Sequence, residues 1–197
     1  MTTSFNMMQS VKRRFFAMRN CALAEQMKNA GAGYKINFGL LQSQVAEIAA
    51  QVRAGTLDER PEKLNPGEMA ELARSLRDNT TTRESMLIAP MVFPAALLSR
   101  EEAEEWLLGS PTPEVADTLC LKLLRGHPDA AAIAAATLSS SESSDMQRYA
   151  ALRLLLNLVA CRKMAPAMAK DLAAGHTGSE VPMVSRLAAQ IVERCEP

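Results

Sequence analysis

The chain has 197 residues and a mass of 21.4 kDa, enough for one domain or one short array of repeats with a sizeable core. Hydrophobic residues make up 48% of the sequence, charged residues 22% and aromatic residues 4%, which excludes a disordered chain and argues against an all-β fold. The formal net charge is zero, from 22 basic and 22 acidic residues, which argues against a simple polycation that coats nucleic acid.

Charge is distributed unevenly along the chain. Residues 1–55 carry 7 basic and 2 acidic residues, a net of +5, and residues 56–117 carry 6 and 13, a net of −7. Residues 118–170 carry 7 and 3, a net of +4, and residues 171–197 carry 2 and 4, a net of −2. Two basic stretches therefore flank an acidic one.

The cysteines and histidines show no pattern of a metal site. Neither type is clustered at metal-ligand spacing, so we expect no metal and no cofactor. We also expect no membrane contact, because no run of about 18 apolar residues is present. Each cysteine lies in an apolar helical pattern, which predicts buried free thiols and a cytoplasmic location where thiols stay reduced. The four are Cys21, Cys120, Cys161 and Cys195.

Helix start signals recur along the chain and give the expected elements in order. One or two helices are expected over residues 5–30, then a turn-rich connection over 31–39 and a helix over 42–53. A proline or a capping Thr or Ser marks the start of most later helices. These are expected over 66–78, from 81 onward, and over 99–108, 112–125, 128–138, 144–162, 166–174 and 179–194. No segment shows sustained period-two alternation, so no β-strand is expected.

The helix starts fall into two alternating sets with a regular spacing. One set starts near Thr81, Thr112, Ser144 and Glu180, which are 31, 32 and 36 residues apart. The other set starts near Pro66, Ser99, Pro128 and Pro166, which are 33, 29 and 38 residues apart. This spacing predicts an all-α, right-handed α-solenoid (an α–α superhelix) of about five HEAT-like helical hairpins, with residues 1–197 as a single domain. We assign the first set to the inner, concave layer.

Asp117 and Arg148 form a candidate pair on this inner layer. Asp117 lies just outside the apolar arc of the helix over 113–125, and Arg148 follows 31 residues later, about one repeat. Equivalent positions in adjacent repeats lie about 10 Å apart. A carboxylate beside a guanidinium on a concave face is suited to catalysis or to positioning a phosphate, and the alternative is a pair that only links the repeats.

Other basic residues are candidates for the same surface. Their functional interpretation is contact with the phosphates of nucleic acid, and the alternative is an ordinary solvated face. The candidates are Arg83, Arg125, Arg153, Arg162 and Lys163.

Six short segments together indicate a family. They are residues 27–30, 34–40, 45–49, 83–89, 114–117 and 147–152. In their order and spacing the chain resembles the HEAT-like DNA alkylation repair enzymes, which include bacterial alkylpurine DNA glycosylases, over roughly residues 15–195.

The resemblance implies a function and a site. It implies binding of duplex DNA in a concave groove and, in active members, release of 3-methyladenine or 7-methylguanine by hydrolysis of the N-glycosidic bond. Asp117 would stabilise positive charge developing on the sugar and help place water, and Arg148 would grip the DNA backbone. The chain departs from the family's aromatic cleft, because Pro113 stands where a Trp is expected, and Gln190 and Glu193 stand near a second Trp and an Arg.

Three functions therefore stay open. The first is a DNA-binding alkylation repair protein with glycosylase activity. The second is a non-catalytic relative that binds duplex DNA. The third is a scaffold that binds protein partners, as many helical solenoids do.

Overall fold

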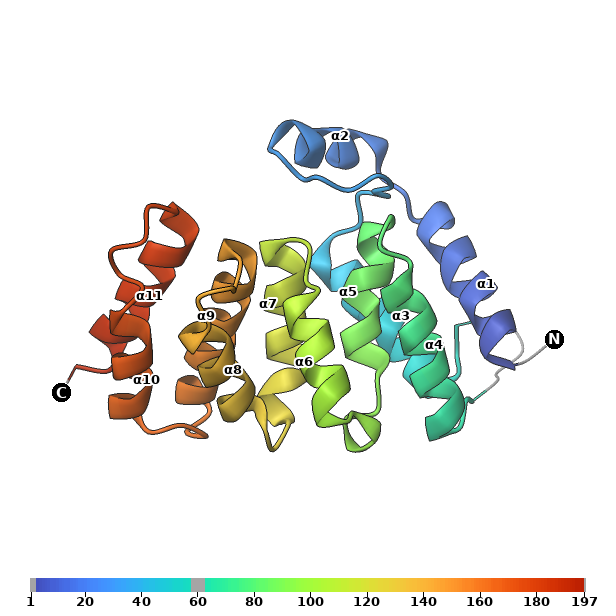
Figure 1. The fold of residues 1–197 in the computed structure, drawn as a ribbon. Helices are drawn as coiled ribbons and strands as arrows, with labels where there is room; N and C mark the ends of the chain where they lie inside the picture. Colours follow the sequence, from blue (N-terminus) through green and yellow to red (C-terminus); the bar gives the residue numbers. More distant parts are fainter. Residues whose placement is uncertain (1–2, 58–62, 197) are drawn as a thin grey trace. The chain divides into compact units, whose positions relative to one another are not determined.

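The computed structural model describes residues 3–57 and 63–196 (Figure 1). These residues form helices and contain no β-strand, although one isolated parallel bridge joins Ile36 to Thr82. The expected all-α fold class is therefore confirmed. Along the same residues, no helix is both long and apolar enough to cross a membrane. The chain divides into two compact units, Met1–Leu97 and Leu98–Pro197.

The helices of the first unit are connected by turns and loops. They are α1 (Thr3–Ala17), α2 (Cys21–Asn29), α3 (Gln42–Ala54), α4 (Pro66–Asp78), α5 (Arg83–Val92) and the 3₁₀ helix η1 (Ala95–Leu97). The second unit contains α6 (Arg100–Leu108), α7 (Pro113–Lys122), the 3₁₀ helix η2 (Leu124–Gly126), α8 (Ala130–Ser139), α9 (Asp145–Ala160), α10 (Pro166–Ala174) and α11 (Pro182–Arg194).

Helix α5 is the core of the first unit. All of its residues are buried, and it packs against α3 and α4, while α1 packs on α4. Helix α2 contrasts with α5, because none of its residues is buried. The backbone N–H of Asn20, at the start of α2, donates to the carbonyl of Phe38 at 2.8 Å. This bond ties α2 to the connection that follows it.

Local capping explains where several helices begin. Asn65 and Ser144 each form a capping box, with Glu68 and Gln147 respectively, and Thr112 accepts a bond from the N–H of Val115 ahead of Pro113. These expected starts are confirmed. Helix α8 begins at Ala130, two residues after the expected start at Pro128, and the starts of α5 and α11 also differ.

The capping box expected at residues 81–84 does not form. Thr82, and not Thr81, is the N-cap of α5, and its hydroxyl donates to Oδ1 of Asn79 instead of making a capping bond. The side chain of Glu84 turns into the interior, where it accepts from the N–H of Phe38. The final helix begins at Pro182 instead of near residue 179, because proline at the first helical position sets its start.

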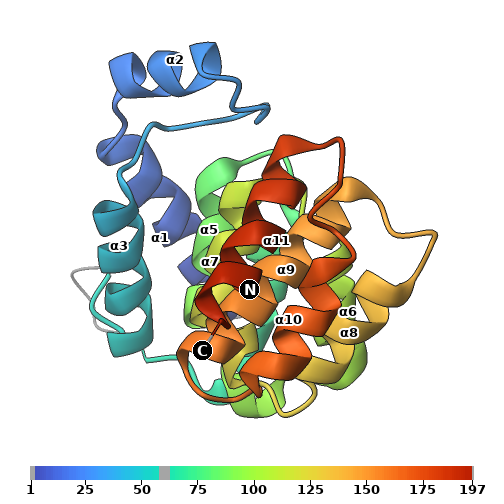
Figure 2. The same ribbon diagram turned by 90° about the vertical axis from the view of Figure 1, so that its left-hand side faces the viewer.

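The second unit has two layers of helices. Helix α9 packs against α7 and α11 on either side and against α8 beneath, and α10 packs against α11. Figure 2 shows α7, α9 and α11 in one layer and α6, α8 and α10 in the other. Below, "the α7–α9–α11 layer" means these three helices.

The cysteines agree only partly with the expectation of buried thiols. Cys120 is buried in α7, whereas Cys21 and Cys161 are exposed and Cys195 is intermediate. Cys21 is exposed because α2 has no buried face, and Cys161 because it lies at the end of α9.

Candidate nucleic-acid interface in the second unit

Asp117 lies in a small polar cluster between α7 and α9. The hydroxyl of Tyr149 donates to Oδ1 of Asp117 at 2.9 Å, and Nε of Arg153 forms an ion pair with the same oxygen at 2.6 Å. Nη2 of Arg153 also donates to the Tyr149 hydroxyl at 3.0 Å. The side chain of Asp117 is 41% exposed, so its carboxylate is held in place but still accessible to solvent.

The guanidinium beside Asp117 belongs to Arg153, and the predicted pairing with Arg148 is wrong. Nη1 of Arg148 lies 3.3 Å from Oδ1 of Asp145, and its Nη2 donates to the carbonyl of Ser141 at 3.3 Å. Arg148 and Arg153 are five residues apart, which places them about 140° apart around α9. Arg153, one turn after Tyr149, is therefore the arginine that reaches α7.

The charges in this cluster are those of a direct ion pair, with the hydroxyl of a neutral tyrosine hydrogen-bonded to both partners. Burial raises the pKa of Tyr149, against a hydrogen bond from Arg153 that lowers it, and the Asp117 carboxylate raises it further. Burial acts to lower the pKa of Arg153, but the Tyr149 hydrogen bond and the Asp117 charge outweigh it, so the pKa of Arg153 is raised.

A basic cluster lies where α7 and α9 end. It consists of four exposed residues: Lys122, Arg125, Arg162 and Lys163. Nζ of Lys163 donates to the carbonyl of Gly126 at 3.4 Å, and η2 packs against α9, so the two chain segments meet. Arg125, Arg162 and Lys163 were expected from the sequence to contact phosphates, whereas Lys122 was not, although its place at the end of α7 was an available signal.

Arg83 is buried and does not lie on a solvated face. Its side chain is 2% exposed in the first unit, where Nη1 donates to the carbonyl of Leu40 at 2.9 Å and to Oε1 of Glu84 at 3.1 Å. The prediction that Arg83 lines a phosphate-contacting face is therefore wrong. The reason is the connection before α3, which covers the start of α5.

The aromatic side chains expected by analogy with the repair enzymes are missing from this surface. Pro113 is exposed at the first position of α7, and Gln190 and Glu193 are exposed on α11. Tyr149 is the aromatic residue of the α7–α9–α11 layer, and it is 7% exposed, while Trp106 is buried in the core. The layer therefore offers no exposed ring on which a base could stack.

The described residues contain no group of three or more His, Cys, Asp and Glu side chains that could hold a metal ion. Between α7 and α9 the second unit presents the held carboxylate of Asp117, and the basic cluster lies at the ends of these two helices. No protein-family model, curated protein or solved structure matches the chain.

Proposed function

We propose that this protein is an α-solenoid that binds duplex DNA through its second unit, with the basic cluster contacting the phosphate backbone. The two layers of alternating helices in the second unit support the solenoid architecture. The resemblance to HEAT-like DNA alkylation repair enzymes supports DNA as the ligand of the basic cluster.

The basic cluster is the observation that carries this proposal. Its four cations lie within residues 118–128 and 146–170, and neither segment contains an acidic residue. Cations at the ends of helices are favoured by the helix dipole, so a purely structural role would also place them there. The two roles differ in their response to salt, because phosphate contacts release counterions from DNA.

Salt-dependent binding of a fluorescent duplex, measured by anisotropy, tests the proposal. Four phosphate contacts give a slope of log affinity against log salt of about −3.6. The double substitution Arg162→Gln and Lys163→Gln removes two contacts and is expected to reduce the magnitude of this slope by about 2. The matched control is Arg186→Gln and Arg194→Gln, which removes two exposed cations from α11, outside the cluster.

The control double variant is expected to show the wild-type slope within experimental error. An affinity that does not change with salt, or equal slopes for the two double variants, contradicts the proposal. A protein that binds no duplex at all supports the scaffold function instead, with a protein as the partner.

A second candidate function is base release, and the geometry of Asp117 favours it. Tyr149 and Arg153 both contact Oδ1, and Oδ2 takes part in neither contact. A carboxylate fixed in this way can stabilise positive charge on a sugar as the C1′–N bond breaks. In that hydrolysis the bonding electrons leave with the alkylated purine, water adds to C1′, and the water's second proton goes to solvent.

Release of 3-methyladenine and 7-methylguanine from methylated duplex, measured by chromatography, tests this second function. Asp117→Asn is expected to reduce the rate by at least about 100-fold, by analogy with the loss of one charge-stabilising group. Asp171→Asn on α10 is the matched control. Equal rates for wild type and Asp117→Asn exclude the catalytic role, and the absence of release by the wild type leaves duplex binding as the function.

A further inference from the structure

Two loops of the second unit line a shallow cavity of about 510 Å³ that is open to solvent. One wall is the end of α8 with the loop that follows it, and the other is the loop between α10 and α11; Arg148 of α9 lies between them. The polar lining comes from six side chains: Ser139, Ser140, Ser141, Arg148, His176 and Ser179.

We infer that this cavity binds a phosphate monoester group. Of the described residues that line it, none carries a carboxylate, whereas a guanidinium, an imidazole and four hydroxyls supply donors. A terminal phosphate has three terminal oxygens and up to two negative charges, so it needs donors from several directions. A guanidinium matches its geometry with two parallel N–H groups.

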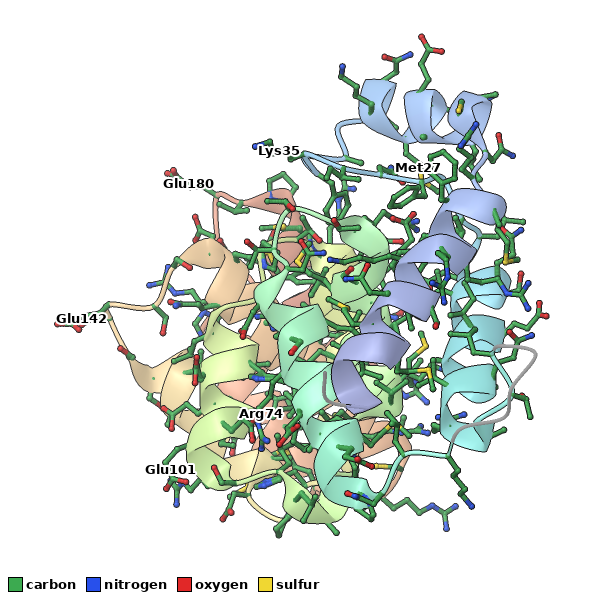
Figure 3. All side chains as sticks on the ribbon, turned by 90° about the vertical axis from the view of Figure 1, so that its right-hand side faces the viewer. Met27, Lys35, Arg74, Glu101, Glu142 and Glu180 are labelled. Atoms are coloured by element: carbon green, nitrogen blue, oxygen red, sulfur yellow. The ribbon has the colours of Figure 1, made fainter. Side chains whose placement is uncertain are left out.

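Arg148 can turn to such a ligand without losing strong contacts. Its bonds to Asp145 and Ser141 are both 3.3 Å long, and its side chain is 28% exposed. The pair with Asp145 joins residues one helical turn apart and is partly solvated, so it contributes little to stability. Glu142 and Glu180, which are carried by the two loops, project outward from them (Figure 3).

The cavity is separate from the basic cluster. Arg148 and Arg162 are fourteen residues apart along and just beyond α9, which corresponds to about 20 Å. Substitution of Arg148 therefore leaves the cluster intact, and the two sites can fail independently.

Titration of isotope-labelled protein with sodium phosphate at constant ionic strength tests the inference. The backbone N–H signals of Gly175, His176 and Gly178 are expected to shift and saturate. Arg148→Gln is expected to weaken phosphate binding about tenfold or more, because it removes a charged donor. The matched control, Arg194→Gln, is expected to bind phosphate as the wild type does.

Absent or non-saturating shifts at the loops overturn the inference, as does equal affinity in Arg148→Gln and wild type. His176→Asn is a second variant that keeps Arg148 in place, and it is expected to weaken binding by a smaller factor.

The source of the phosphate is distinguished with duplexes that carry or lack a 5′-phosphate. If the protein prefers the phosphorylated duplex and Arg148→Gln removes this preference, the cavity binds the phosphate at a strand end. Saturable binding of inorganic phosphate with no such preference assigns it to a free phosphate ester. Duplex binding through the basic cluster does not involve Arg148. Arg148→Gln is therefore expected to lose phosphate binding and to keep duplex binding unchanged, so a failure of this inference can be told apart from a failure of the proposed function.

Discussion

The hydroxyl of Tyr149 donates to Oδ1 of Asp117 at 2.9 Å and joins the second turn of α9 to α7. The same hydroxyl accepts a hydrogen bond from Arg153, so its oxygen lies between a cation and an anion. Tyr149 is 7% exposed, whereas its two partners are more accessible, at 27% for Arg153 and 41% for Asp117. The tyrosine is therefore the buried member of the cluster, and it holds the carboxylate from the protein side.

We expect Tyr149→Phe to lower the free energy of unfolding by about 1 kcal/mol, the usual net contribution of one hydrogen bond. Water can replace the hydroxyl at its accessible partners, so a larger loss is not expected. Asp117→Asn weakens the same cluster, and the double variant should cost less than the sum of the two single variants because the residues are in contact. Urea unfolding followed by circular dichroism measures all three, and strictly additive costs would show that the cluster does not act as a unit.

The stabilising effect of Tyr149 should depend on pH. Burial raises the pKa of Tyr149 in the folded state above the ordinary value of about 10. The contribution of the neutral hydroxyl is then complete below pH 10 and is lost as pH rises through the folded pKa. The stability difference between wild type and Tyr149→Phe should therefore shrink as pH rises above about 10.

Urea midpoints at a series of pH values measure this difference, with tyrosinate absorbance to follow the titration. The protein has two tyrosines, Tyr34 and Tyr149, so Tyr149→Phe shows which absorbance change belongs to Tyr149. A stability difference that is the same at every pH would contradict the assignment.

The sequence predicted the features that depend on neighbouring residues. The starts at Pro66 and Pro113 follow from a cap and a proline, which act within one helical turn. The surroundings of Arg83 could not be predicted in this way, because its partner Leu40 is 43 residues away. The partner of Asp117 likewise depends on how α9 is aligned against α7. The length of the chain segment between these two helices sets that alignment.

Gly39 is expected to tolerate no side chain. It has a positive φ of 72°, and a Cβ there would overlap the carbonyl oxygen of Asn20 and lie 2.7 Å from the backbone nitrogen of Ala24. Gly31 has a positive φ of 93° with no atom within 4 Å of such a Cβ, so it is a matched control for backbone strain alone. We expect Gly31→Ala to cost about 1–2 kcal/mol and Gly39→Ala clearly more, since it adds a steric clash to the same strain.

Hydrogen exchange of the α2 amides, together with thermal unfolding, measures this difference. Gly39→Ala should lower protection at the start of α2 because residues there must move. Gly31→Ala lies beyond the other end of α2 and should leave protection at the start of the helix close to wild type. Equal effects of the two substitutions would show that the approach of α2 to Gly39 is not maintained in solution.

Glu84 is fully buried in the first unit and fixes the connection before α3. Its carboxylate accepts hydrogen bonds from the backbone N–H groups of Phe38 at 3.2 Å and Leu40 at 3.3 Å, and it pairs with Arg83 at 3.1 Å. Glu84→Gln preserves the shape of the side chain but leaves the buried charge of Arg83 without its counter-ion. Breaking a buried ion pair in this way costs about 3–5 kcal/mol.

The matched control is Glu47→Gln on α3, where the exposed carboxylate accepts a bond from Gln51 within the same helix. We expect this control to change the free energy of unfolding by no more than about 0.5 kcal/mol. Urea unfolding compares the two variants, and hydrogen exchange at Phe38 and Leu40 reports on the connection directly. If Glu84→Gln were as mild as Glu47→Gln, and amide protection at Leu40 stayed at its wild-type level, the other bonds of the connection would suffice to hold it. These are the backbone bonds of Ile36 to Thr81 and Arg83 and the bond from the Arg83 side chain to the Leu40 carbonyl.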